Sequence, residues 1–244
     1  MRAGWLAIGS AILTMGGAVG ATGQSAEIPP ARDPVILARD VEIALARSAA
    51  PPAVGAAASV LALEDGRYGV AAEGTNGVTC YVSRSWPGSL EPHCFDAEGS
   101  RTILPIHLRR AERGFAGATK DEIDREIADG LETGGFRLPS RPVVSWMLSG
   151  AQILYNEEGK RAGSWKPHLM IYWPHWTKEE AGMTGVDFGE AFLVDEGAAE
   201  SVLVVLQTSF VQPDLAPEAL AAVEAASRAA DPTAADRAAD RSRE

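Results

Sequence analysis

Five short apolar runs follow Pro142, and their spacing restricts the fold more than any other feature of the sequence. Apolar residues, many of them β-branched or aromatic, dominate these runs, and turn-forming residues such as Glu158-Gly159 separate them. A succession of strands joined by short turns is typical of an antiparallel sheet. The runs are VVSWML, AQILYNE, HLMIYW, EAFLVDE and ESVLVVLQ, over 143–148, 151–157, 168–173, 190–196 and 200–207.

A hairpin is predicted near the start of the chain. Residues 58–64 and 67–73 read as two strands, because Asp65 and Gly66 between them readily adopt the positive φ angles of a tight turn. A third strand is predicted over 78–82.

Three helices are predicted from apolar residues spaced three and four apart, over 37–48, 102–115 and 119–133. The last begins with a capping box formed by Thr119 and Glu122. Because the two clearest helices lie between groups of sequential strands, the sequence predicts a single α+β domain. We expect a largely antiparallel sheet, two to three packed helices and one disulfide.

The N-terminus has the order of a secretory signal. Arg2 precedes an uncharged stretch from Ala3 to Val19, and small residues follow. We expect cleavage between Ala21 and Ala26, a periplasmic or secreted location, and no membrane span after cleavage. The predicted division is a signal peptide over 1–26, one α+β domain over 27–212 and a C-terminal tail over 213–244.

The C-terminal tail is rich in Ala and acidic residues, and we expect it to be partly helical or disordered. Residues 216–230 have high helix propensity, but their apolar positions are mostly Ala. Such a helix is predicted to bury too little area to be held on the core.

Cys80 and Cys94 are the only two cysteines. An even count in an exported chain predicts a disulfide between them, closing a loop of about 15 residues. The alternative is a Cys94 nucleophile activated by the adjacent His93. This is less favoured, since a catalytic thiolate needs its base nearby in space rather than next in the chain.

Composition and motifs exclude several common classes of protein. The formal charge is −11, from 33 acidic and 22 basic residues, so nucleic acid is not an expected partner. The sequence has no Gly-rich phosphate loop, dinucleotide fingerprint or paired-cysteine metal motif, and no nucleophile elbow surrounds Ser145, Ser149 or Ser164. We therefore assign no cofactor and no metal.

Four short blocks, GTNGVTC (74–80), CFDAEGS (94–100), SWMLS (145–149) and PHLMIYWP (167–174), resemble a group of uncharacterised exported bacterial proteins. That group has a Gly-Thr-Asn-Gly block leading to Cys, a Cys-x-Asp-x-Glu-Gly-Ser block and a Pro-His-x-Met-x-Tyr block in the same order. The resemblance implies a shared fold and export. It also marks Asn76, Asp96, Glu98 and His168 as candidate site residues.

Asp96, Glu98 and His168 are the candidates for catalysis. If the sheet brings them together, one histidine and two carboxylates are suited to holding a divalent metal or to acid and base roles in hydrolysis. The structural alternative is that the carboxylates cap the following helix and that His168 ties a strand end to a carbonyl group.

Trp165 and Trp176 are the candidates for an exposed aromatic surface, with Asn76 as a further ligand-binding candidate. Alternation places Trp173 with Leu169 and Ile171, on the side predicted to face inward. The expected partner is an unknown small molecule, glycan or peptide. We expect an exported protein with a binding or structural role in the cell envelope, and a metal-dependent or acid/base hydrolase is the alternative.

Overall fold

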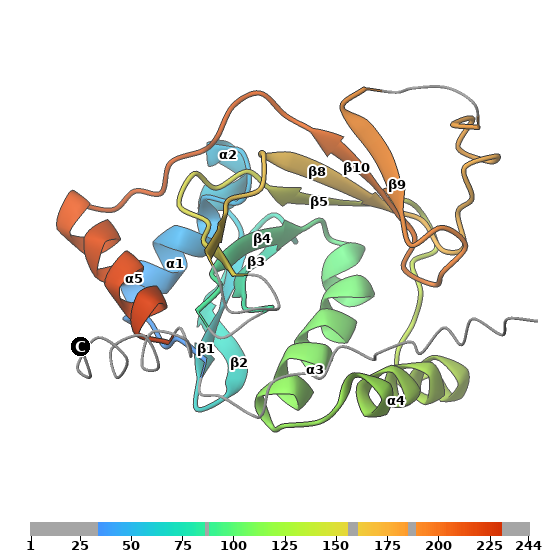
Figure 1. Cartoon of the computed structure of the whole chain (residues 1–244), viewed down its shortest axis with the longest axis horizontal. Coiled ribbons are helices and arrows are strands. Elements are labelled where there is room, and N and C mark those ends of the chain that lie inside the picture. Colours follow the sequence, from blue (N-terminus) through green and yellow to red (C-terminus); the bar gives the residue numbers. More distant parts are fainter. Residues whose placement is uncertain (1–33, 86–87, 156–160, 185–188, 231–244) are drawn as a thin grey trace, which may run out of the picture.

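A computed structural model describes residues 34–85, 88–155, 161–184 and 189–230. Within these ranges, eight strands form one mixed sheet in the order β2-β1-β3-β4-β5-β8-β10-β9, and β6 and β7 form a separate pair. The α-helices number five in this part of the chain (Figure 1). The predicted α+β domain with one disulfide is confirmed, while the predicted signal peptide and the last residues of the tail lie outside the described residues.

The elements have the following bounds. The helices are α1 (Arg39–Arg47), α2 (Pro52–Ala56), the short 3-10 helix η1 (Gly99–Arg101), α3 (Ile103–Phe115), α4 (Lys120–Thr133) and α5 (Pro217–Ala229). The strands are β1 (Ser59–Glu64), β2 (Arg67–Ala72), β3 (Thr79–Ser83), β4 (Glu91–Phe95), β5 (Val143–Met147), β6 (Leu154–Tyr155), β7 (Arg161–Gly163), β8 (His168–Tyr172), β9 (Ala191–Val194) and β10 (Val202–Leu206).

The predicted hairpin joins β1 and β2. Asp65 and Gly66 have φ angles of 49° and 75°, the left-handed conformation that fits a two-residue turn to the twist of its strands. β1 also pairs in parallel with β3, and all other neighbouring strands of the large sheet are antiparallel. The sheet is therefore largely antiparallel, as predicted.

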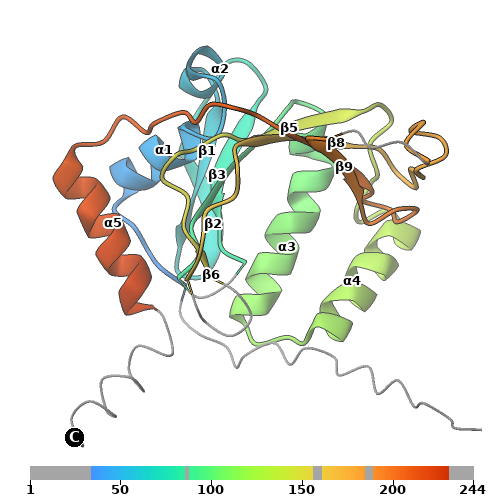
Figure 2. The ribbon, with the colours of Figure 1, turned by 45° about the horizontal axis from the view of Figure 1, so that its top comes forward.

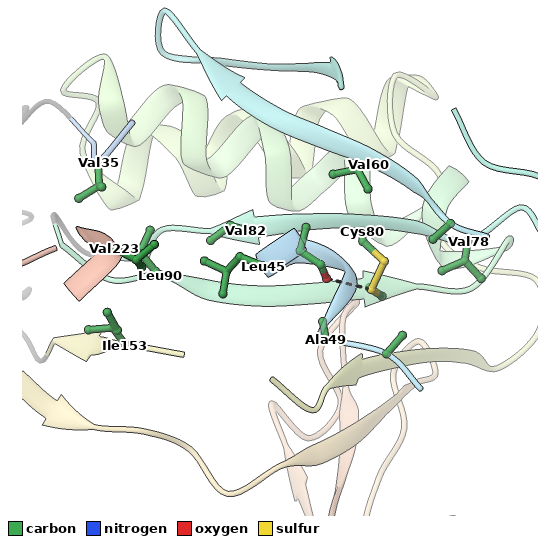
Figure 3. Packing of buried hydrophobic residues seen from close by; sticks show 14 of the residues in the cluster. Val35, Leu45, Ala49, Val60, Val78, Cys80, Val82, Leu90, Ile153 and Val223 are labelled. Carbon is green, nitrogen blue, oxygen red and sulfur yellow. Dashed lines mark hydrogen bonds between the residues drawn. A yellow bond between two sulfur atoms is a disulfide. The ribbon is translucent and has the colours of Figure 1, made fainter. Parts of the chain in front are cut away.

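The disulfide joins β3 to β4 at the centre of one core cluster. Cys80 and Cys94 are directly opposite each other in the register, with Cα atoms 4.0 Å apart, and both are fully buried (Figure 3). Because the Cys94 sulfur is bonded to Cys80, the alternative of a Cys94 nucleophile is excluded. The sequence did not predict β4, because all five of its residues are buried and the polar-apolar alternation of a half-exposed strand is absent.

α3 lies on one side of the sheet, which bends over it so that β5 and β8 lie above the helix (Figure 2). Ile103 and Leu104 of α3 share a buried cluster with Tyr81 of β3, Phe95 of β4 and Tyr172 of β8. We call this side of the sheet the α3 side. α4 packs beside α3 through Ile123 and Ile127.

The predicted capping box begins α4. The Thr119 hydroxyl accepts a hydrogen bond from the Glu122 amide, and the Glu122 carboxylate accepts one from the Thr119 amide at 2.8 Å. The helix ends at Gly134, whose φ of 79° favours glycine. Both ends therefore follow from local sequence.

α1 covers the opposite face of the sheet, over β1, β3 and β4; we call this the α1 side. Leu45 and Ala46 of α1 pack there against Val60 and Cys80 (Figure 3). At one end of this layer, Glu42 of α1 forms a fully buried ion pair with Arg84, with contacts of 2.7 and 3.0 Å.

α5 packs beside α1 and corrects one expectation about the tail (Figure 1). The helix forms as predicted, but it is held on the core. Val223 is buried in the cluster under α1, and the Ser227 hydroxyl donates to the carbonyl of Gly88 at 2.6 Å. Arg161 of β7 also binds the Glu224 carboxylate through two nitrogens, at 2.7 and 2.9 Å. Val223, the packing of Ala226 and Ala230 against the same cluster, and these polar contacts together hold the helix on the core.

The faces of β8 are the reverse of the prediction. His168, Met170 and Tyr172 are buried on the α3 side, whereas Leu169 and Ile171 are only partly buried on the other. The reason is tertiary: α3 covers the first set, and no helix among the described residues covers the second (Figure 2). Trp173 is half-buried beyond the strand end.

Candidate functional site

Asp96 and Glu98 stabilise the chain between β4 and α3. Asp96 accepts hydrogen bonds from the amides of Glu98 and Gly99 with one carboxylate oxygen, and from the amide of Val144 with the other. Glu98 accepts from the amide and hydroxyl of Ser140 and pairs with Arg101 at 3.1 Å. Hydrogen bonding by the Ser140 amide is the main reason that the pKa of Glu98 is lowered. Both carboxylates therefore have a structural role. The predicted capping of the following helix is wrong for α3, because Asp96 binds amides at the start of η1, Glu98 binds Ser140, and the residue before α3 has no side-chain cap.

His168 lies apart from these carboxylates. It is opposite Met147 at the end of β5, whereas Asp96 pairs with Val144 near the start of that strand. Three residues of strand correspond to about 10 Å, and β5 also lies between the two positions. His168 Nδ1–H donates to the carbonyl of Lys166 at 2.8 Å, and burial lowers the pKa of the ring.

The structure therefore does not bring Asp96, Glu98 and His168 into one site. Within the described ranges, no group of three His, Cys, Asp or Glu side chains is arranged to hold a metal ion.

Asn76 ties the loop before β3 to α2. Its side-chain nitrogen donates to the carbonyl of Val54 at 2.8 Å, and its oxygen accepts from the amide of Val78 at 3.0 Å. Both polar atoms thus have partners within the fold.

Trp165 is 55% exposed, and Trp176 is half-buried. The side chain of Gln152 holds the backbone of Trp165 through two hydrogen bonds, at 3.0 and 3.3 Å, and the indole ring meets the His168 ring edge to face. Trp165 is therefore an anchored, accessible aromatic residue, and the two tryptophans do not present equally exposed rings.

A buried serine–histidine pair lies between β4 and β5. Ser145 Oγ is 3.0 Å from His93 Nε2, and the two residues are 0% and 4% exposed. The His93 ring lies against the rings of Phe95 and Tyr81. Burial lowers the pKa of His93 well below its usual value, with further contributions from His107 and His168. Sequence analysis missed this pair because 52 residues separate its members.

His107 on α3 links this buried region to the surface. Its Nε2 lies 3.4 Å from Glu200, and Arg110 binds the same carboxylate through two nitrogens, at 2.7 and 2.8 Å. Burial alone would raise the pKa of Glu200, but hydrogen bonds from His107 and Arg110 lower it. The network attaches α3 to the residues before β10. Ser145 is fully buried beneath this region, so a substrate cannot reach the serine–histidine pair.

An open groove runs along α3, between this helix and the β1–β2 hairpin. Its first part is a hollow of about 420 Å³, walled mainly by apolar side chains of β1 and α3 and by Phe136 after α4. Its lining residues are Leu61, Thr79, Ser100, Leu104, Pro105, Leu108, Arg109, Glu112 and Phe136.

The second part of the groove is a hollow of about 460 Å³ with charged walls. Arg109 and Glu112 line both hollows, so the two adjoin. Glu126 of α4 holds Arg109 and also Arg113, the latter at 2.9 Å. In the described part of the chain, no side chain pairs with Arg67 on the hairpin wall. The groove thus joins an apolar end to a charged end.

The volume of each hollow falls in the range of about 300 to 1,000 Å³ that small-ligand sites occupy, and the first hollow combines apolar walls with a few polar groups. Comparison with protein-family models, curated proteins and solved structures finds no match to this chain. The fold and site define a disulfide-bonded, single-domain α+β protein with an open groove along one helix. None of its described helices is long and apolar enough to cross a membrane.

Proposed function

We propose that this is an exported binding protein of the cell envelope, whose ligand lies in the groove along α3. The observation that carries the proposal is the adjoining of an apolar hollow and a charged hollow on one helix. The buried disulfide is compatible with an oxidising compartment outside the cytoplasm.

The groove favours a small molecule with an apolar body and a polar end. Leu104, Leu108 and Phe136 offer the body an apolar wall. Arg109, which lines both hollows, and Arg67 of the charged hollow offer hydrogen-bond donors to the polar end. Apolar walls supply most of the affinity in such sites, and a few polar groups fix the orientation.

Hydrolysis is less well supported. Asp96 and Glu98 are occupied by backbone amides at the start of the α3 region, and His168 lies at the far end of β5. The buried Ser145–His93 pair lines neither hollow of the groove. Because none of these residues is placed to act on a ligand in the groove, a binding role is favoured over hydrolysis.

The test is a panel of small amphiphilic fragments, scored by the rise they cause in the unfolding temperature of the mature protein. We expect several fragments to stabilise the wild type and to lose this effect in Leu108→Trp, which fills the apolar hollow. Leu108→Arg, which places a charge there, is a second blocking variant. Ile36→Trp is the matched control, since Ile36 is 52% exposed before α1 and away from the groove.

The proposal is contradicted if no fragment stabilises the wild type. It is equally contradicted if stabilisation survives unchanged in both Leu108 variants, because the fragments then bind elsewhere.

A further inference from the structure

Three neighbouring strands carry apolar side chains on both faces, with Ser145 and His168 as polar exceptions on the α3 side. The sequences of β5, β8 and β10 are VVSWM, HLMIY and VLVVL, and alternate residues of each are buried on the α3 side. Antiparallel strands with one face in water normally alternate apolar with polar residues. The other residues of these strands, which point away from α3, are also apolar, and this is typical of a covered face.

These side chains form two complete rows across four strands. One row is Val144, Ile171, Leu203 and Leu193, and the other is Trp146, Leu169, Val205 and Ala191, as the pairing of β5, β8, β10 and β9 requires. We call these eight residues the outer patch. It contains no charged or hydrogen-bonding side chain except the indole N–H of Trp146.

The outer patch is partly accessible in the described structure. All eight residues are partly exposed, and only Trp146 belongs to a buried cluster or packs against one on this side. On this side of the sheet, α1 and α2 lie over the half formed by β1, β3 and β4. No described helix lies on this side of β5, β8 and β9 (Figure 2). A continuous apolar patch on a soluble protein is often a binding surface.

The size of the outer patch fits one helix. Four strands about 4.8 Å apart and two rows about 7 Å apart give a footprint of roughly 200 to 300 Å². A stable interface between two copies needs about 800 Å² from each partner, so the patch alone is too small for a dimer. A helix about 10 Å wide and about 12 residues long spans the four strands. α1, with nine residues, covers the other half of the same face in this way.

The net charge of the protein indicates which charged residues flank the apolar stripe of the docked helix. The patch itself is uncharged, and the whole chain has a formal charge of −11. A partner with Lys or Arg flanking its apolar stripe is attracted to such a protein, whereas an acidic one is repelled.

We propose that the outer patch docks one amphipathic helix of a partner protein, with basic residues along the flanks of its apolar stripe. This surface lies on the opposite side of the sheet from α3 and its groove. The proposal is therefore independent of the ligand of the groove.

The test uses two synthetic helical peptides of about 14 residues with the same Leu stripe, one flanked by Lys and one by Glu. Each is titrated into the mature protein, and binding is followed by fluorescence anisotropy and by the NMR signal of the Trp146 indole. We expect the Lys peptide to bind at least about tenfold more tightly than the Glu peptide and to shift the Trp146 signal.

Two variants and a control locate the binding. Leu203→Lys places a charge in the centre of the patch, and Leu203→Thr removes apolar area while keeping a residue that favours strands. Both are expected to weaken binding of the Lys peptide, the first by more than about tenfold. Val70→Lys, at an exposed apolar position on β2, is expected to have no effect.

The proposal is overturned if neither peptide shifts the Trp146 signal, or if the two peptides bind equally well. It is also overturned if sedimentation shows a dimer of the wild type that Leu203→Lys dissociates, because the occupant is then a second copy.

Discussion

At the residue scale, the side chains with the most promising chemistry are used to hold the fold. Asp96 binds three backbone amides, and Glu98 binds the backbone and side chain of Ser140. Sequence analysis offered catalysis or capping of the following helix as their roles, and neither carboxylate caps α3. The observed contacts were not predictable, because the amide of Val144 is brought to Asp96 only by the pairing of β4 with β5.

The buried His93 predicts a loss of stability in mild acid. In the unfolded chain this ring titrates near its usual pKa of 6.5, whereas burial keeps its pKa well below that in the fold. The unfolded state therefore binds the proton first, and the free energy of unfolding decreases as the pH falls below 6.5. Above that pH, His93 is neutral in both the folded and the unfolded chain, and its protonation no longer lowers the free energy of unfolding.

Urea unfolding at about pH 7.5 and about pH 5.5 measures this effect, which we expect to be about 1 kcal/mol per histidine. His93→Gln should reduce the loss, and His175→Asn, at an exposed position, should not. An equal loss in wild type and His93→Gln would show that other groups cause the acid sensitivity.

The buried ion pair between Glu42 and Arg84 predicts a large effect of removing one partner. Glu42→Gln leaves the Arg84 charge, which is 1% exposed, without its carboxylate, and should lower the free energy of unfolding by about 3 to 5 kcal/mol. The double variant Glu42→Leu with Arg84→Met should cost less than Glu42→Gln alone. Lys166→Ala breaks an exposed pair with Glu190 and should cost no more than about 1 kcal/mol. Equal costs for the buried and exposed pairs would contradict this.

At the element scale, the elements that were predicted depend on neighbouring residues, and those that were missed depend on contacts between distant parts of the chain. Asp65-Gly66 predicts the hairpin and the Thr119–Glu122 box predicts the start of α4, because each depends on neighbouring residues only. β4 was missed because α1 covers one of its faces and α3 the other, so that all five of its residues are buried. The attachment of α5 was missed because Ser227 binds Gly88, 139 residues earlier.

The disulfide is predicted to stabilise the pairing of β3 with β4. Cys80→Ala with Cys94→Ala should lower the free energy of unfolding by about 3 kcal/mol, the value for a closed loop of about 15 residues. Native protein should not react with a thiol reagent, and should react fully only after unfolding and reduction, since both sulfurs are buried. Labelling of the native, unreduced protein would contradict the bond.

α5 is predicted to depend on Val223. Val223→Ala removes two methyl groups from the core and should cost about 2 kcal/mol. Amide hydrogen exchange in α5 should become faster than in α3, while the exposed Glu218→Gln should leave exchange unchanged. Unchanged exchange in α5 of Val223→Ala would show that the polar contacts alone hold the helix.

At the scale of the whole molecule, the bend of the sheet over α3 separates two surfaces. The α3 side carries the groove, and the outer patch lies on the other side of the sheet. The class of fold follows from the order of strand and helix patterns in the sequence. The positions of the two surfaces do not follow from the sequence. Leu61 and Phe136 line one hollow only in the folded chain, and β8 has apolar residues on both faces, so alternation does not tell which face is covered.

The most direct test of the central claim is an amide-resolved NMR map of the protein with the same amphiphilic fragments. A binding protein with its ligand along α3 predicts that shifts gather at Leu104, Leu108, Arg109 and Phe136. The amides of Asp96, Glu98 and His168 should stay unshifted, because their contacts are internal to the fold. Shifts that gather instead around those three residues would contradict the claim and favour an enzyme.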